Sequence, residues 1–123
     1  MPTNQETFDA VVAHARKQNA RAVSAAGGCR YRTVFGKKCF YGCLIPDEDY
    51  DPVIEGEALS LTPPGCAAWT AARVLWDITQ KLGHDLRLAK ELQEVHDHKP
   101  VDDWECGFRR IAANYELTYT PPG

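Results

Sequence analysis

The sequence predicts an α+β fold, a helix-dominated single domain with about four helices and one short β-hairpin. Three observations support this prediction. The chain has 123 residues, the length of one domain. Alanine supplies 15 of its apolar residues, which favours closely packed helices over a large β-sandwich. Residues 29–41 depart from helical spacing and are rich in aromatic and β-branched side chains.

The first helix is predicted from its start signal. Thr3-x-x-Glu6 is a capping-box pattern, in which each side chain accepts a hydrogen bond from the other residue's backbone N–H. Apolar residues then follow at helical spacing: Phe8, Val11, Val12 and Ala15. The helix should end near residues 18–19, and Gly27-Gly28 breaks the chain.

The β-hairpin and an acidic loop follow. Residues 29–35 and 39–41 are the expected strands, with a turn at 36–38 between them. Residues 46–57 contain two prolines and a glycine, which exclude a regular helix and leave a loop. Net charge changes sharply here, from +5 over residues 1–45 to −6 over residues 46–57.

The second predicted helix starts after Thr62-Pro-Pro, covers residues 67–82 and stops at Gly83. Its broad apolar face includes Trp69 and Trp76. An alanine-rich helix of this kind packs equally well internally or in a homodimer, so the oligomeric state stays open.

Two more helices complete the domain. Asp85 caps the third helix, which Pro100 ends. Asp102-x-x-Glu105 resembles a second capping box and starts the fourth. Its apolar stripe runs through Trp104, Phe108, Ile111, Ala112 and Tyr115. The domain is assigned to residues 1–123, with a tail that frays from about residue 118.

Composition excludes several classes of protein. No run of 18 apolar residues exists, so no membrane span is predicted. The first residues lack the basic and apolar regions of a signal peptide. Five cysteines, an odd number without an export signal, indicate free thiols in a reducing compartment, the cytoplasm.

Metal and thiol chemistry are weakly indicated. Asp47, Asp49 and Asp51 alternate like the start of a calcium loop, but Pro52 and Ala58 replace its glycine and bidentate glutamate. A zinc site or thiol enzyme could use the pair Cys39-x3-Cys43 together with a histidine. The sequence leaves open whether these two cysteines are structural or functional.

Other thiol combinations can be written with equal ease. They pair Cys29 or Cys43 with His84 or His96, with Asp97 as the orienting group. His96 and His98 point away from each other on a helix and cannot easily share an ion. We therefore assign no metal, cofactor or catalytic residue and keep a small thiol- or metal-dependent enzyme as an alternative.

Nucleic-acid binding is a second alternative. Arg30, Arg32, Lys37 and Lys38 lie among the hairpin aromatics, an arrangement that suits phosphate neutralisation with base stacking. Strand alternation would instead send the aromatics to the core. The three tryptophans could line a ligand pocket, but their helical spacing is more typical of core residues.

The segment from Gly36 to Gly56 is the least generic part of the chain. It follows the pattern GxKCxxGxLIPDxxYDPxxEG, and Cys29-Arg-Tyr-Arg32 precedes it. This pattern resembles a family of small proteins encoded by phages, prophages and other bacterial mobile elements. The resemblance covers most of the chain and carries over no catalytic residue.

The resemblance implies a non-enzymatic accessory protein that binds a host protein or nucleoprotein complex. An inhibitor of bacterial immunity, such as an anti-CRISPR protein, belongs to this class. The expected contact surface is the hairpin together with the acidic loop at residues 46–57, and the loop would meet a basic partner surface. The six carboxylates of the loop are Asp47, Glu48, Asp49, Asp51, Glu55 and Glu57.

Overall fold

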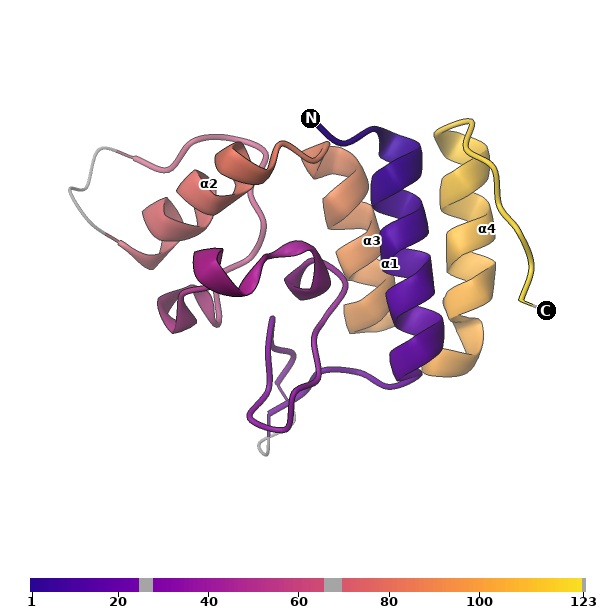
Figure 1. Cartoon of the computed structure of the whole chain (residues 1–123), viewed down its shortest axis with the longest axis horizontal. Helices are drawn as coiled ribbons and strands as arrows, with labels where there is room; N and C mark the ends of the chain where they lie inside the picture. The colour runs from indigo at the N-terminus through magenta and orange to yellow at the C-terminus, as the bar shows by residue number, and fades with distance from the viewer. Residues whose placement is uncertain (25–27, 66–69, 123) are drawn as a thin grey trace.

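The computed structural model of the chain describes residues 1–24, 28–65 and 70–122, and these residues form a helical architecture. Their α-helices are α1 (Asn4–Gln18), α2 (Ala71–Leu82), α3 (Leu86–His98) and α4 (Trp104–Asn114). Figure 1 shows α1, α3 and α4 side by side, with α2 and the irregular segment that precedes it on one flank. No described helix is both long and apolar enough to cross a membrane.

The predicted α+β fold with a β-hairpin is wrong, because the described residues contain no strand and no sheet. The predicted hairpin region makes only isolated antiparallel bridges, Val23–Cys29 and Arg32–Lys38. Side chains take the backbone donors that a ladder would need. The Tyr31 and Arg32 N–H groups donate to the Glu55 carboxylate, and the Lys38 N–H donates to Gln18 Oε1. Pairing therefore cannot propagate beyond a single bridge.

Two predicted helix starts and one predicted helix stop are confirmed. Thr3 and Glu6 form the predicted capping box of α1. The Asp85 carboxylate accepts from two backbone N–H groups at the start of α3. Helix α2 ends at Gly83, whose φ of 75° is the left-handed conformation predicted for a helix stop.

The start of α2 differs from the prediction. Thr70, not the Thr62-Pro-Pro segment, caps the helix through a hydrogen bond from the Arg73 N–H. The predicted first residues of this helix, including Trp69, lie outside the described residues.

The start of α4 also differs. Its N-cap, Asp103, makes no side-chain capping bond, so the predicted capping box does not form. Glu105 instead accepts two hydrogen bonds from the Arg16 guanidinium, at 3.1 and 2.7 Å. The tail beyond α4 is bonded to α1. The Thr118 N–H donates to Gln5 Oε1, and the Gln5 NH₂ group donates to the Thr118 carbonyl.

Two hydrophobic clusters lie within the described part of the chain. One joins α1, α3 and α4, where Phe40 packs against Phe108 and Trp104 with ring centroids 5.5 and 4.8 Å away. The other lies under the irregular segment and contains Tyr31 and Tyr41. Four single-turn 3-10 helices carry the chain over these clusters: Gly42–Leu44, Asp47–Asp49, Pro52–Ile54 and Val101–Asp103.

Candidate interaction surface

The acidic loop lies against the basic segment of the same chain. Glu55 is central to this contact, and its side chain is only 9% exposed. It accepts hydrogen bonds from the Tyr31 N–H at 2.8 Å, the Arg32 N–H at 3.1 Å and the Tyr50 hydroxyl at 2.5 Å. Burial and this carboxylate together raise the pKa of Tyr50 to about 12. Glu55 therefore holds the loop in place instead of facing solvent.

The other loop carboxylates have separate environments. Asp47 pairs with Arg32 at 2.9 Å, and Asp49 pairs with Lys81 of α2. Asp51 caps the 3-10 turn that follows it, through the Val53 N–H. These three carboxylates point to different partners, so they do not assemble the calcium loop that their spacing suggested.

Two of the loop residues that were predicted to contact a partner are exposed to solvent. Glu48 is exposed, and the Asp47 side chain is 84% exposed despite its ion pair. Glu57 is half-buried, and its backbone carbonyl accepts from the Tyr31 hydroxyl. The structure thus divides the six predicted contact residues: Asp49, Asp51 and Glu55 make contacts within the fold, and Asp47 and Glu48 are exposed.

The four predicted basic residues also separate into two pairs. Arg32 is only 17% exposed, lies 4.4 Å from the Tyr50 ring centroid and donates to the Ile45 carbonyl at 2.7 Å. Arg30 donates to the Arg32 carbonyl and lies 3.9 Å from Glu55. Both arginines therefore stabilise the loop contact, and Lys37 and Lys38 lie on the turn beyond it.

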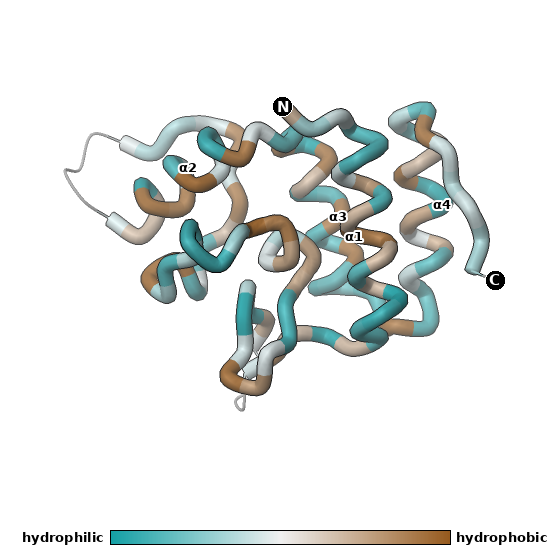
Figure 2. The backbone as a smooth tube through the Cα atoms, viewed as in Figure 1, coloured by the Kyte–Doolittle hydropathy of each residue, from teal (hydrophilic) through white to brown (hydrophobic). Residues whose placement is uncertain are grey.

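That turn carries the two most exposed large apolar side chains of the irregular segment. Val34 is 92% exposed and Phe35 is 90% exposed, whereas Tyr31, Phe40 and Tyr41 are buried. The prediction that hairpin aromatics belong to the core is thus confirmed for three residues and wrong for Phe35. Figure 2 shows the turn as a hydrophobic segment at the edge of the molecule.

Backbone hydrogen bonds keep the turn compact. The Thr33 N–H donates to the Lys37 carbonyl at 2.9 Å, and the Gly36 N–H donates to the Thr33 carbonyl at 3.1 Å. Gly36 has a φ of 85°, a conformation that glycine adopts without steric cost. The tip formed by Val34 and Phe35 is therefore presented by a closed turn.

Helix α1 holds the turn in place through side-chain hydrogen bonds to the backbone of Lys38. Gln18 bonds both backbone groups of Lys38, accepting from its N–H at 2.9 Å and donating to its carbonyl at 2.8 Å. His14 Nε2 donates to the same carbonyl at 2.8 Å. Burial lowers the pKa of His14, so the imidazole is neutral near pH 7. Sequence reasoning missed both supporting residues, because their partner lies twenty or more positions away.

Positive charge surrounds the tip. An open hollow of about 380 Å³ lies beside the tip. The residues that line it are His14, Lys17, Gln18, Phe35, Gly36, Lys37 and Lys38. Lys17 and Lys37 form no ion pair with any other described residue, and Lys38 lies 3.9 Å from Asp47. We define the tip surface as Val34, Phe35, Lys17, Lys37 and Lys38.

The thiol alternative has one counterpart in the fold. Among the described residues, one cluster could supply three metal ligands: Cys29, His96 and Asp97. His96 is fully buried, and its Nε2 accepts from the Ala22 N–H at 3.0 Å. That bond places the ring proton on Nδ1, which donates to Asp97 at 2.8 Å.

This hydrogen-bond pattern does not suit catalysis or metal binding. The imidazole nitrogen that would accept a thiol proton is already used by a backbone N–H. A metal on Nδ1 would require Nε2 to carry a proton that points at the Ala22 N–H. Burial raises the pKa of Cys29, and burial raises the pKa of Cys43 to about 12. The predicted pair Cys39 and Cys43 is not part of this cluster.

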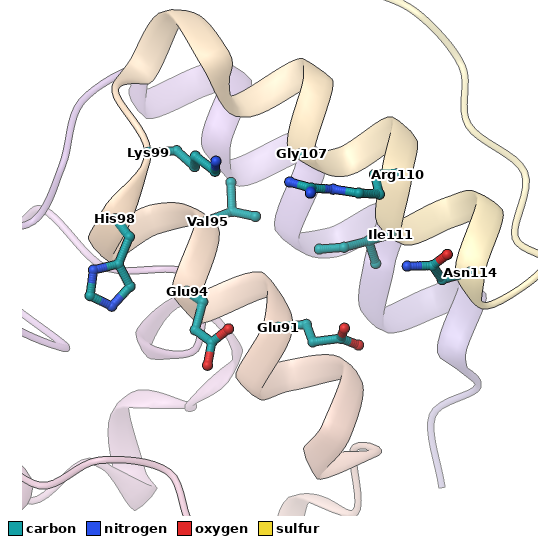
Figure 3. A pocket seen from close by; sticks show the side chains of 9 residues that line it. All are labelled: Glu91, Glu94, Val95, His98, Lys99, Gly107, Arg110, Ile111 and Asn114. Atoms are coloured by element: carbon teal, nitrogen blue, oxygen red, sulfur yellow. The ribbon is translucent and has the colours of Figure 1, made fainter.

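Two further hollows lie away from the tip surface. A groove of about 310 Å³ lies between α3 and α4. Its lining side chains include Glu91, Glu94 and Arg110 together with the apolar Val95 and Ile111 (Figure 3). Its mixed charges select no ligand class. Trp76 lines a hollow of about 340 Å³ beside α2, whereas Trp104 is buried in the core.

No family model, curated protein or solved structure matches this chain.

Proposed function

We propose that this chain is a non-enzymatic accessory protein of phage or mobile-element origin that acts by binding a host macromolecule. The observation that carries the proposal is the tip surface, in which Val34 and Phe35 project into solvent from a closed turn. Large exposed apolar residues that are rimmed by charged residues are typical of protein interaction sites.

Two further features support binding over chemistry. In the Cys29, His96 and Asp97 cluster both imidazole nitrogens already have partners, the Ala22 N–H and the Asp97 carboxylate. Burial also raises the pKa of Cys39 and Cys43. Resemblance of the segment Gly36–Gly56 to proteins of phages and mobile elements suggests the setting. A bacterial immune complex, as for an anti-CRISPR protein, is the proposed target.

The test is a plaque assay in a bacterial strain whose CRISPR immunity blocks a tester phage. Expression of the protein should restore plaques. The double variant Val34→Ser/Phe35→Ser should lose this effect, and the matched surface variant Glu94→Ala, at an exposed position of α3, should keep it. Far-UV circular dichroism checks that each variant is folded. No plaques with the wild-type protein would reject inhibition of immunity, and full activity of the double variant would move the function away from the turn.

Nucleic acid is a second candidate target, because Phe35 lies exposed beside Lys17, Lys37 and Lys38. Base stacking on an aromatic side chain next to cations is a recurrent mode of single-strand binding. Binding of this kind weakens steeply as salt concentration rises. An electrophoretic shift with a twenty-residue thymidine oligonucleotide at low salt tests it, and the absence of a shift rejects it.

A further inference from the structure

We infer, on the basis of the proposed function, that the tip surface fits a groove on a protein partner that has an apolar floor and an acidic rim. Three properties of the described residues lead to this partner: the shape of the tip, the distribution of unpaired charge around it, and the internal use of the two nearby arginines.

The shape requires a concave, apolar partner surface. Val34 and Phe35 are adjacent and almost fully exposed, and they lie at the convex end of the turn. Gln18 and His14 fix the backbone at Lys38, so the turn loses little conformational freedom when it binds. A preformed apolar projection of this kind is suited to act as the anchor of a small interface.

The charge around the tip requires an acidic rim. Lys17 and Lys37 have no carboxylate partner among the described residues, and Lys38 has only the distant Asp47. Their three charges flank the hollow behind Phe35. Carboxylates on the partner would pair with them at the edge of the contact, which favours correct orientation and fast association.

The internal pairing of the arginines favours a protein over nucleic acid. Arg30 and Arg32 would extend the positive surface, but they contact Glu55, Asp47 and Tyr50 instead. The remaining three lysines offer few phosphate contacts. Val34 has no ring on which a base could stack, so only Phe35 could stack with one.

Site-specific photo-crosslinking tests this inference. Phe35 is replaced by a benzophenone-bearing amino acid in the full chain, which is then irradiated in the bacterial strain of the plaque assay. The same amino acid at Ala113, which is exposed on α4, is the matched control. Mass spectrometry identifies the peptide that carries the adduct.

The expected result is an adduct on an apolar segment flanked by Asp or Glu, which is absent with the Ala113 control. Lys37→Glu should lower the adduct yield at least tenfold, Lys99→Glu should leave it unchanged, and a Glu→Lys change on the mapped partner should restore it. Phe35→Ser should weaken binding to that partner at least 30-fold, the loss typical of an interface anchor.

Three results would overturn the inference: no adduct, an adduct that nuclease removes, or an adduct on a neutral or basic protein surface. The plaque assay separates these results from a failure of the proposed function. Restored plaques that depend on Val34 and Phe35, together with a nuclease-sensitive adduct, would keep the function and reject the protein groove. An adduct on an apolar segment flanked by Asp or Glu, without restored plaques, would support the apolar groove with an acidic rim and reject inhibition of immunity.

Discussion

Replacement of Glu55 by alanine should destabilise the fold more than replacement of any other carboxylate in the acidic loop. The change removes the acceptor of two backbone N–H groups, those of Tyr31 and Arg32, and of the Tyr50 hydroxyl. Hydrogen bonds to a charged group contribute about 1.5–3 kcal/mol each. The Tyr50 hydroxyl can bond to water instead, and the Arg30 pair adds little because its N–O distance is 3.9 Å and the Arg30 side chain is 39% exposed.

The two backbone bonds therefore dominate, and we expect a loss of about 3–6 kcal/mol in the free energy of unfolding. Glu55→Gln should lose about half as much, because the amide keeps one acceptor but turns its NH₂ group toward a backbone donor. Glu57→Ala is the matched control, since the Glu57 carboxylate bonds to no other described residue.

Urea denaturation followed by far-UV circular dichroism measures all three variants. The expected order of loss is Glu55→Ala, then Glu55→Gln, then Glu57→Ala, with the last near zero. A Glu55→Ala variant within about 0.5 kcal/mol of Glu57→Ala, the usual range of a neutral surface change, would refute the inference that this carboxylate holds the acidic loop.

Three other predictions concern packing, pH and thiol reactivity. Gly42→Ala should unfold at much lower urea, because its Cβ would lie 2.1 Å from the Tyr31 carbonyl oxygen; a wild-type midpoint would contradict this close approach. Burial lowers the pKa of His84 from its ordinary 6.5, so its contribution to stability is present above pH 6.5 and is lost as pH falls through the folded-state pKa. His84→Gln should therefore flatten the acid limb of a stability–pH curve, and an unchanged limb would argue against it. Iodoacetamide at pH 8 should label exposed Cys106 before Cys43, whose pKa is raised to about 12; equal labelling in the native protein, measured by peptide mass spectrometry, would contradict the burial of Cys43.

The prediction of the fold was correct where neighbouring residues decide the structure. Thr3 with Glu6 and Asp85 with the N–H groups of Arg87 and Leu88 are contacts within one helical turn, and their patterns are visible in the chain itself. The same reasoning was wrong at Glu105. Its partner, Arg16, is 89 positions away, and a bidentate ion pair outweighs a local cap.

The candidate site shows the same division. Sequence placed Lys37 and Lys38 in a turn and identified the opposition of a basic and an acidic segment. It could not show that these segments pair with each other, nor that Phe35 is exposed while Phe40 is buried. Residue type does not distinguish these two phenylalanines, because their exposure depends on where the turn leaves the core.

The sequence by itself determined the helical character of α1, α2, α3 and α4, three of the signals that start or stop these helices, and the positions of the charged residues. Only the tertiary structure decided that the hairpin is not a sheet and that Glu55 of the acidic loop is directed inward. The physical reason is competition for backbone donors. The Glu55 carboxylate accepts hydrogen bonds from the Tyr31 and Arg32 N–H groups, which are 24 and 23 positions away. No pattern of neighbouring residues predicts that contact.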